Sequence, residues 1–192
     1  MNQLYADRLG RVCGQLENKG LTQMIVSDPL SIWYLTGVRI EPYERLFALY
    51  IRTDGKHVFF LNNLFVIPET DIGKVWMSDT DDCIGIVAAH VDAGSDMGVD
   101  KSWPARFLLD LMERNPGVRY VNASACVDGV RSIKDDYEKE KMRESSRIND
   151  ACMEKAAAWL KEGMTEKECA DYIRSLYKEE GCEEGFNTII SF

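Results

Sequence analysis

Two apolar runs joined by a short turn constrain the fold of this chain most. The runs cover residues 46–51 and 58–61, and Thr53-Asp54-Gly55-Lys56 lies between them. Asp-Gly is favoured in the tight turns of β-hairpins, because both residues tolerate the positive φ angles that such turns require. The sequence therefore predicts a pair of antiparallel strands around Asp54.

Further strands alternate with helices on both sides of this hairpin. Met24-Ile25-Val26 predicts a buried strand, and Asp28 and Pro29 then favour a helix start that Gly37 should end. The remaining patterns predict helices at 2–19, 81–90 and 105–114 and strands at 75–77, 97–99 and 118–121. We expect an α/β fold with a mixed sheet flanked by helices.

The pattern changes after Val127, where we expect a domain boundary between residues 1–127 and 128–192. A long charged helix is predicted over residues 135–161, and a capping box of Thr165 and Glu168 predicts a second helix to about residue 180. Thr188-Ile189-Ile190 then resembles a first strand. Two helices and one strand bury little apolar surface, so we expect the second domain to be incomplete.

Composition argues against several classes of partner. The net charge of −9 repels phosphate backbones, so we expect no nucleic-acid partner. The longest apolar stretches, such as residues 84–91, fall short of the ~20 residues that a membrane-spanning helix needs, so we expect no membrane partner. The first residues lack a secretory signal, and the six cysteines show no closely spaced pair. We expect reduced thiols and a cytoplasmic location.

The histidines and the acidic stretch of this sequence do not match familiar catalytic or metal-binding motifs. His57 and His90 do not lie near a serine or cysteine in a nucleophile motif. The acidic stretch 79–82, with Gly85 nearby, lacks the glycine and glutamate positions of a calcium loop. Capping of the helix at 81–90 by Asp81 is the better interpretation. We assign no catalytic residue and no metal ligand within this chain.

Five segments occur in a characteristic order along the chain. They are residues 24–37, which end in Tyr34-Leu35-Thr36-Gly37; Glu44-Arg45-Leu46 before the hairpin; residues 127–143; residues 161–166; and residues 186–192. In this order they resemble the N-terminal portion of Xaa-Pro peptidases, the prolidase and aminopeptidase P members of the creatinase-like metallopeptidase family. The resemblance implies a creatinase/prolidase-type N-terminal domain, followed by the first helices and strand of a pita-bread catalytic domain.

The resemblance also implies an activity for the intact protein. Such enzymes hydrolyse the peptide bond before proline in short peptides, using two divalent metals such as manganese, cobalt or zinc. Two aspartates, a histidine and two glutamates hold the metals in the family, all of them C-terminal to the segment that ends at Phe192. Glu183 and Glu184 are therefore expected to be solvated loop charges, and the 192-residue chain alone is expected to be inactive.

In relatives the N-terminal domain helps to form a homodimer and places a loop near the active-site cleft. The matching loop covers residues 38–45, in which Pro42 limits flexibility. Glu41, Tyr43 and Arg45 are the candidate substrate or lid residues. Many relatives carry a histidine near the position of Tyr43. The alternative interpretation is a polar loop in which Arg45 pairs with a neighbouring carboxylate.

Two other functions remain open at this point. The chain could be a non-catalytic binding or dimerisation module related to creatinase-type proteins. It could also be an unrelated α/β hydrolase with an acidic, RNase H-like site, although the predicted strands lack the required pattern of acids. The choice between dipeptidase and aminopeptidase stays open as well.

Overall fold

The chain divides into two compact units that meet at Ile133 and Lys134 in a computed structural model that describes residues 2–191. Helix α5 (Ser124–Ser132) runs through Val127 and packs Cys126, Val127 and Val130 into the core of the first unit. A division at Val127 would cut this helix. Sequence reasoning did not predict α5, because Ala123 at its N-cap provides no side-chain capping signal.

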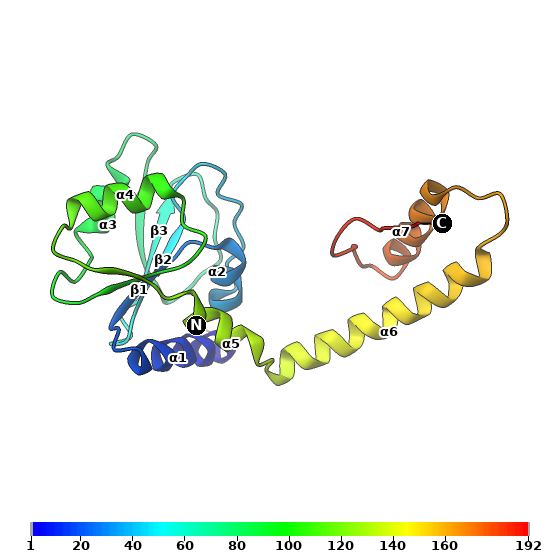
Figure 1. Cartoon of the computed structure of the whole chain (residues 1–192), viewed down its shortest axis with the longest axis horizontal. Helices are drawn as coiled ribbons and strands as arrows, with labels where there is room; N and C mark the ends of the chain where they lie inside the picture. Colours follow the sequence, from blue (N-terminus) through cyan, green and yellow to red (C-terminus); the bar gives the residue numbers. More distant parts are fainter. Residues whose placement is uncertain (1, 192) are drawn as a thin grey trace. The chain divides into compact units, whose positions relative to one another are not determined.

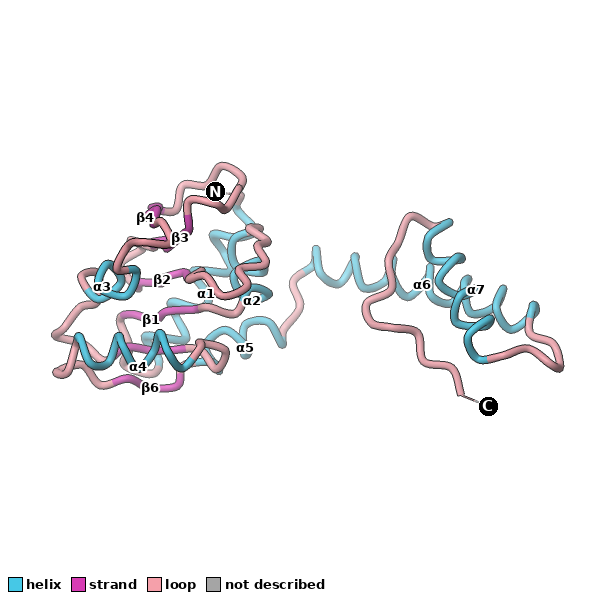
Figure 2. Tube along the Cα trace, turned by 90° about the horizontal axis from the view of Figure 1, so that it is seen from above, coloured by secondary structure: helices cyan, strands magenta, loops and turns pink. Residues whose placement is uncertain are grey.

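A six-stranded mixed sheet forms the centre of the first unit. Its order is β4-β3-β2-β1-β5-β6 (Figure 2). Strand β2 runs antiparallel to β1 and β3, and the other neighbouring pairs are parallel. This confirms the predicted mixed sheet and the hairpin at Asp54-Gly55. The strands are β1 (Gln23–Val26), β2 (Ala48–Arg52), β3 (Val58–Asn62), β4 (Gly73–Met77), β5 (Met97–Val99) and β6 (Tyr120–Asn122).

Helices cover both faces of this sheet (Figures 1 and 2). One face packs against α1 (Gln3–Asn18), α2 (Pro29–Thr36) and α5, and the other against α3 (Cys83–Ala88) and α4 (Ala105–Arg114). Side chains alternate between the two faces, so Phe59 joins the first core and Phe60 joins the second. Both phenylalanines are fully buried. The sheet is therefore the middle layer of three, as expected for an α/β fold.

The predicted ends of α2 are confirmed, whereas the predicted cap of α3 is wrong. Asp28 accepts a hydrogen bond from the Ser31 amide at 2.8 Å, and Gly37 ends α2 with a φ of 77°. In α3 the cap is Asp82, which accepts from the Gly85 amide at 3.0 Å. Asp81 instead accepts from the Ser78 amide at 2.6 Å, because it closes the turn that precedes the helix.

The second unit is built from two helices, α6 (Asp136–Trp159) and α7 (Glu166–Glu179), each opened by a capping box. The box of Thr165 and Glu168 is as predicted. The strand expected at residues 188–190 is absent from the part of the chain that the structure describes. A strand requires an adjacent strand for its backbone hydrogen bonds, and the described residues of this unit provide none.

A partly buried carboxylate joins the end of β1 to the end of β5. Asp100 accepts hydrogen bonds from the amides of Ser27 and Asp28, both at 2.8 Å, and from the Ser27 hydroxyl at 3.0 Å. Burial, opposed by these hydrogen bonds, raises the pKa of Asp100 above its usual range. The raised pKa means that the ionised form is less favourable in the folded protein than in the unfolded chain, so this group lowers stability as the pH rises through its folded-state pKa.

Two substitutions of Asp100 distinguish the contribution of its hydrogen bonds to stability from that of its charge. Asp100→Ala leaves two amides at the β1–α2 turn without an acceptor and should lower the free energy of unfolding by about 1–3 kcal/mol. Asp100→Asn keeps an oxygen acceptor and removes the partly buried charge, so it should cost less than half as much. Urea unfolding followed by tryptophan fluorescence measures both. The control is Asp96→Ala, which removes an ion pair with Arg119 at the surface and should cost about 0–1 kcal/mol. Equal losses for Asp100→Ala and Asp96→Ala would contradict a stabilising role for the Asp100 hydrogen bonds.

The two units should differ in their ability to fold alone. The first has a core on each face of its sheet, whereas the buried apolar side chains of the second are Cys152, Ala156, Cys169, Ile173 and Leu176. Apolar burial supplies most of the folding free energy. A fragment of residues 1–133 should unfold cooperatively in urea, and a fragment of residues 134–192 should melt gradually in circular dichroism. A cooperative transition in the second fragment would show that its small core suffices.

Candidate functional site

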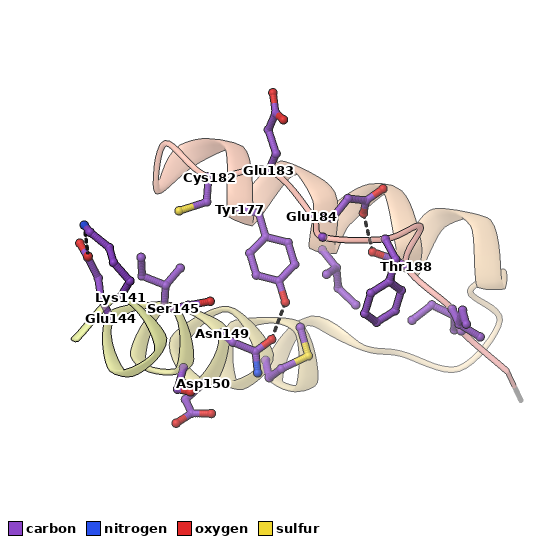
Figure 3. Close-up of a pocket in the computed structure, with 18 residues that line it drawn as sticks. Lys141, Glu144, Ser145, Asn149, Asp150, Tyr177, Cys182, Glu183, Glu184 and Thr188 are labelled. Carbon is purple, nitrogen blue, oxygen red and sulfur yellow. Dashed lines mark hydrogen bonds and ion pairs between the residues drawn. The ribbon is translucent and has the colours of Figure 1, made fainter. Parts of the chain in front are cut away.

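One hollow lies in the second unit, between α6, α7 and residues 182–190 (Figure 3). Its volume is about 900 Å³. The Tyr177 side chain crosses this hollow, and its hydroxyl donates to Asn149 Oδ1 at 2.6 Å. Lys141 pairs with Glu144 at the edge of the hollow. Phe186 adds an apolar side chain that is 76% exposed. Four of the polar side chains of this hollow are thus bonded to one another in two pairs.

Glu184 has partners that the sequence did not predict. It accepts a hydrogen bond from the Thr188 hydroxyl at 2.6 Å and pairs with Arg174 at 3.1 Å, and its side chain is only 18% exposed. The Thr188 hydrogen bond, and then the Arg174 guanidinium, lower the pKa of Glu184. The expectation of a solvated charge is therefore wrong for Glu184, whereas Glu183 is exposed.

The residues present do not fit a metal centre. Among residues 2–191, histidine, cysteine, aspartate and glutamate side chains do not gather in any group of three or more that could hold an ion. A dinuclear site needs several such ligands around each pair of ions. We therefore assign no metal and no metal-dependent step to this part of the chain.

The smaller hollow, of about 380 Å³, lies in the first unit beside the predicted lid loop, and we call it the loop hollow. Arg45 lines it, whereas Glu41 and Tyr43 do not. Tyr43 is 80% exposed and has a φ of 50°, a left-handed conformation that is unfavourable for a residue with a side chain. The structure therefore separates the three predicted residues: Arg45 lies in the hollow, and Glu41 and Tyr43 face solvent. Their role toward a substrate stays a prediction.

Arg45 is held by a bidentate ion pair inside this hollow. Its Nε and Nη2 atoms donate to the two carboxylate oxygens of Asp79, each at 3.0 Å, and Nη1 lies 3.2 Å from Glu44. The Asn62 amide also donates to Asp79 Oδ1 at 2.7 Å. The Arg45 hydrogen bond, followed by that of Asn62, lowers the pKa of Asp79 below its usual range. Asp79 is thus ionised over the physiological pH range and bound on both oxygens.

Asn62, Asp79 and Arg106 are residues of this hollow that sequence reasoning missed. Asn62 ends β3, Asp79 follows β4, and Arg106 belongs to the first turn of α4. The parallel register of β3 and β4 pairs Asn62 with Met77 and so brings Asp79 within reach. The sequence shows the acidic stretch but not this pairing, because the order of strands in a sheet is a tertiary property.

Each of the two histidines contacts a backbone group of its own hairpin or helix. His57 Nδ1 accepts from the Arg52 amide at 3.3 Å, and burial lowers the pKa of His57. His90 Nδ1 lies 2.8 Å from the Ile86 carbonyl, and its ring packs edge-on against Phe60.

Between residues 2 and 191, the chain forms no helix with the length and apolar character needed to cross a membrane.

Comparison with known proteins gives matches along nearly the whole chain. Residues 8–133 match the creatinase/prolidase N-terminal domain, and residues 140–192 match metallopeptidase family M24. An uncharacterized peptidase of Staphylococcus aureus (strain bovine RF122 / ET3-1) is 28% identical over 197 residues, which cover 96% of this chain and 54% of that protein. The chain thus spans about half the length of the curated relatives that it matches.

Solved structures show the same architecture. The dipeptidase PepE from Mycobacterium ulcerans superposes with a TM-score of 0.83 at 26% identity, over 93% of this chain and 50% of that one. A prolidase from Thermococcus sibiricus gives a TM-score of 0.80 at 21% identity, over 95% and 52%, and supports the fold alone. These matches exclude the RNase H-like interpretation. The chain therefore belongs to the creatinase/prolidase family, and joins a creatinase/prolidase N-terminal domain to the start of a family M24 metallopeptidase domain.

Proposed function

We propose that this chain is the N-terminal portion of a metal-dependent Xaa-Pro peptidase that hydrolyses the bond before proline in short peptides. The order of the two family matches, 8–133 followed by 140–192, is the observation that carries the proposal. The prolidase name of the matched N-terminal domain and the dipeptidase activity that names the Mycobacterium ulcerans structure support this choice of substrate. Manganese, cobalt or zinc would be bound by residues outside the described part of the chain.

The first unit would contribute dimerisation and a loop that covers the active site. Leu64 and Val66, which are 67% and 89% exposed after β3, offer apolar surface for contact with a second copy. Tyr43 lies at the exposed tip of the loop of residues 38–45, where it can contact a bound peptide. The six free cysteines support a reducing, cytoplasmic location.

The metal dependence can be tested by comparing this chain with the product of a longer reading frame. The longer protein, incubated with manganese, should hydrolyse a dipeptide with C-terminal proline, and a chelator should abolish the activity until manganese is restored. The 192-residue chain should release no proline, because its described residues form no metal site. A dipeptide without proline is the control substrate. A longer protein that folds and binds metal but cleaves neither peptide would favour the non-catalytic binding module instead.

Truncation of the Tyr43 side chain at the loop tip should slow the reaction without unfolding the protein. In the longer protein, Tyr43→Ala should lower kcat/KM for the proline dipeptide by about tenfold, the equivalent of roughly 1.4 kcal/mol of lost transition-state contact. The matched control is Leu109→Ala on α4, which removes another exposed apolar side chain of the first unit, 59% accessible, outside the loop. Steady-state kinetics and thermal unfolding are measured on both. Equal kcat/KM for the two variants would remove the loop tip from the proposed function.

A further inference from the structure

The lid loop is fastened to two different elements at its C-terminal end. The Arg45 side chain reaches Asp79, which follows β4, with both donor–acceptor distances at 3.0 Å. Arg106 of α4 donates a hydrogen bond to the carbonyl oxygen of Glu44, the preceding residue. Side-chain and backbone contacts to two different elements thus fix two consecutive loop residues at the loop hollow.

The Asp79 carboxylate is itself oriented by the sheet. The Asn62 side-chain nitrogen at the end of β3 donates to Asp79 Oδ1, and Asn62 Oδ1 accepts from the Leu64 amide at 2.9 Å, which fixes the direction of the Asn62 side-chain amide. Asp79 therefore cannot turn away from Arg45 without losing the Asn62 bond. A planar guanidinium matched to an oriented carboxylate has a defined direction as well as a charge.

The loop conformation needs such support. The Arg45 amide donates to the Pro42 carbonyl at 2.9 Å and closes a turn in which Tyr43 has its positive φ. A residue other than glycine keeps that conformation only where the surrounding structure imposes it. The tip at Tyr43 is solvent-exposed, so the supporting contacts described above lie at Glu44 and Arg45.

From these contacts we propose that Asp79 is a positioning residue for the lid loop: it holds Arg45 as an anchor, so that Tyr43 rather than Arg45 meets the substrate. The proposal rests on the lid role given to this loop above. It also changes the role of Arg45, because a guanidinium that binds both oxygens of Asp79 and faces Glu44 has its charge neutralised within the protein. Asn62 and Arg106 act as secondary supports of the same anchor.

The anchor can be tested on the 192-residue chain, without any activity. Asp79→Asn removes one oxygen acceptor and the charge, so amide hydrogen exchange in residues 39–45 should become about three- to fivefold faster, the upper part of the range for a lost, partly exposed ion pair. The matched control is Asp81→Asn, which changes the same charge at the same hollow but affects only an acceptor of Ser78. Its exchange in this loop should stay within about twofold of the wild type. Unchanged exchange in Asp79→Asn would overturn the proposal.

Arg45→Lys distinguishes the bidentate geometry from charge alone. Lysine keeps the positive charge but cannot make two parallel hydrogen bonds, so exchange should rise as in Asp79→Asn. Exchange equal to that of the wild type would mean that an unspecific attraction suffices and would contradict the anchor. Thermal unfolding of each variant checks that the sheet remains folded.

Steady-state kinetics of the longer protein provide a second test of the proposal. Asp79→Asn and Arg45→Lys should raise KM for the proline dipeptide by a similar factor, and Asp81→Asn should leave it unchanged. An Arg45 variant that loses activity while Asp79→Asn keeps it would show that Arg45 contacts the substrate directly, and this would overturn the proposal. If the longer protein has no peptidase activity, the proposed function fails, and the exchange measurements still decide whether Asp79 positions the loop.

Discussion

The position of every candidate functional residue in the first unit depends on the burial of β1. Met24, Ile25 and Val26 are completely buried, with neighbouring side chains facing opposite layers of helices. This strand also joins the two halves of the sheet, because it pairs antiparallel with β2 and parallel with β5. The chain leaves β1 at the turn that Asp100 holds, and α2 and the lid loop follow directly. A shift of β1 would therefore move the loop as well.

The second half of the lid loop has few apolar side chains that pack into a core. Val38 is buried and Ile40 packs against the first core, and Leu46 and Phe47 after the loop are buried, whereas Glu41 and Tyr43 are exposed. Apolar packing thus fixes the first residues of the loop and the chain that follows it, but not the conformation around Tyr43. That conformation depends on polar contacts, which are directional and individually weak. A loop built in this way can hold an exposed aromatic ring at a defined place and still yield when a ligand binds.

The sequence predicts those features that are determined locally. The Asp54-Gly55 hairpin, the Asp28 and Gly37 ends of α2 and the Thr165 capping box all depend on residues within a few positions of one another. It does not predict contacts that require the strand order, such as Asn62 with Asp79. The missed helix α5 and the choice of Asp82 over Asp81 as a cap have a related cause. In both cases the local signals are absent or duplicated, and packing decides the outcome.

The strand predicted at residues 188–190 shows how the second unit differs from the first. The β-branched run is present, but Ile189 is 80% exposed and a strand forms only when another strand pairs with it. Tyr137 and Met142 of the predicted apolar stripe on α6 are likewise 58% and 55% exposed, while Cys152 and Ala156 farther along the helix are buried. Apolar side chains gathered along a hollow and a helix face are typical of a surface that contacts further protein. In relatives about twice as long, such a surface has additional chain available to cover it, so this unit has the character of one part of a larger catalytic domain.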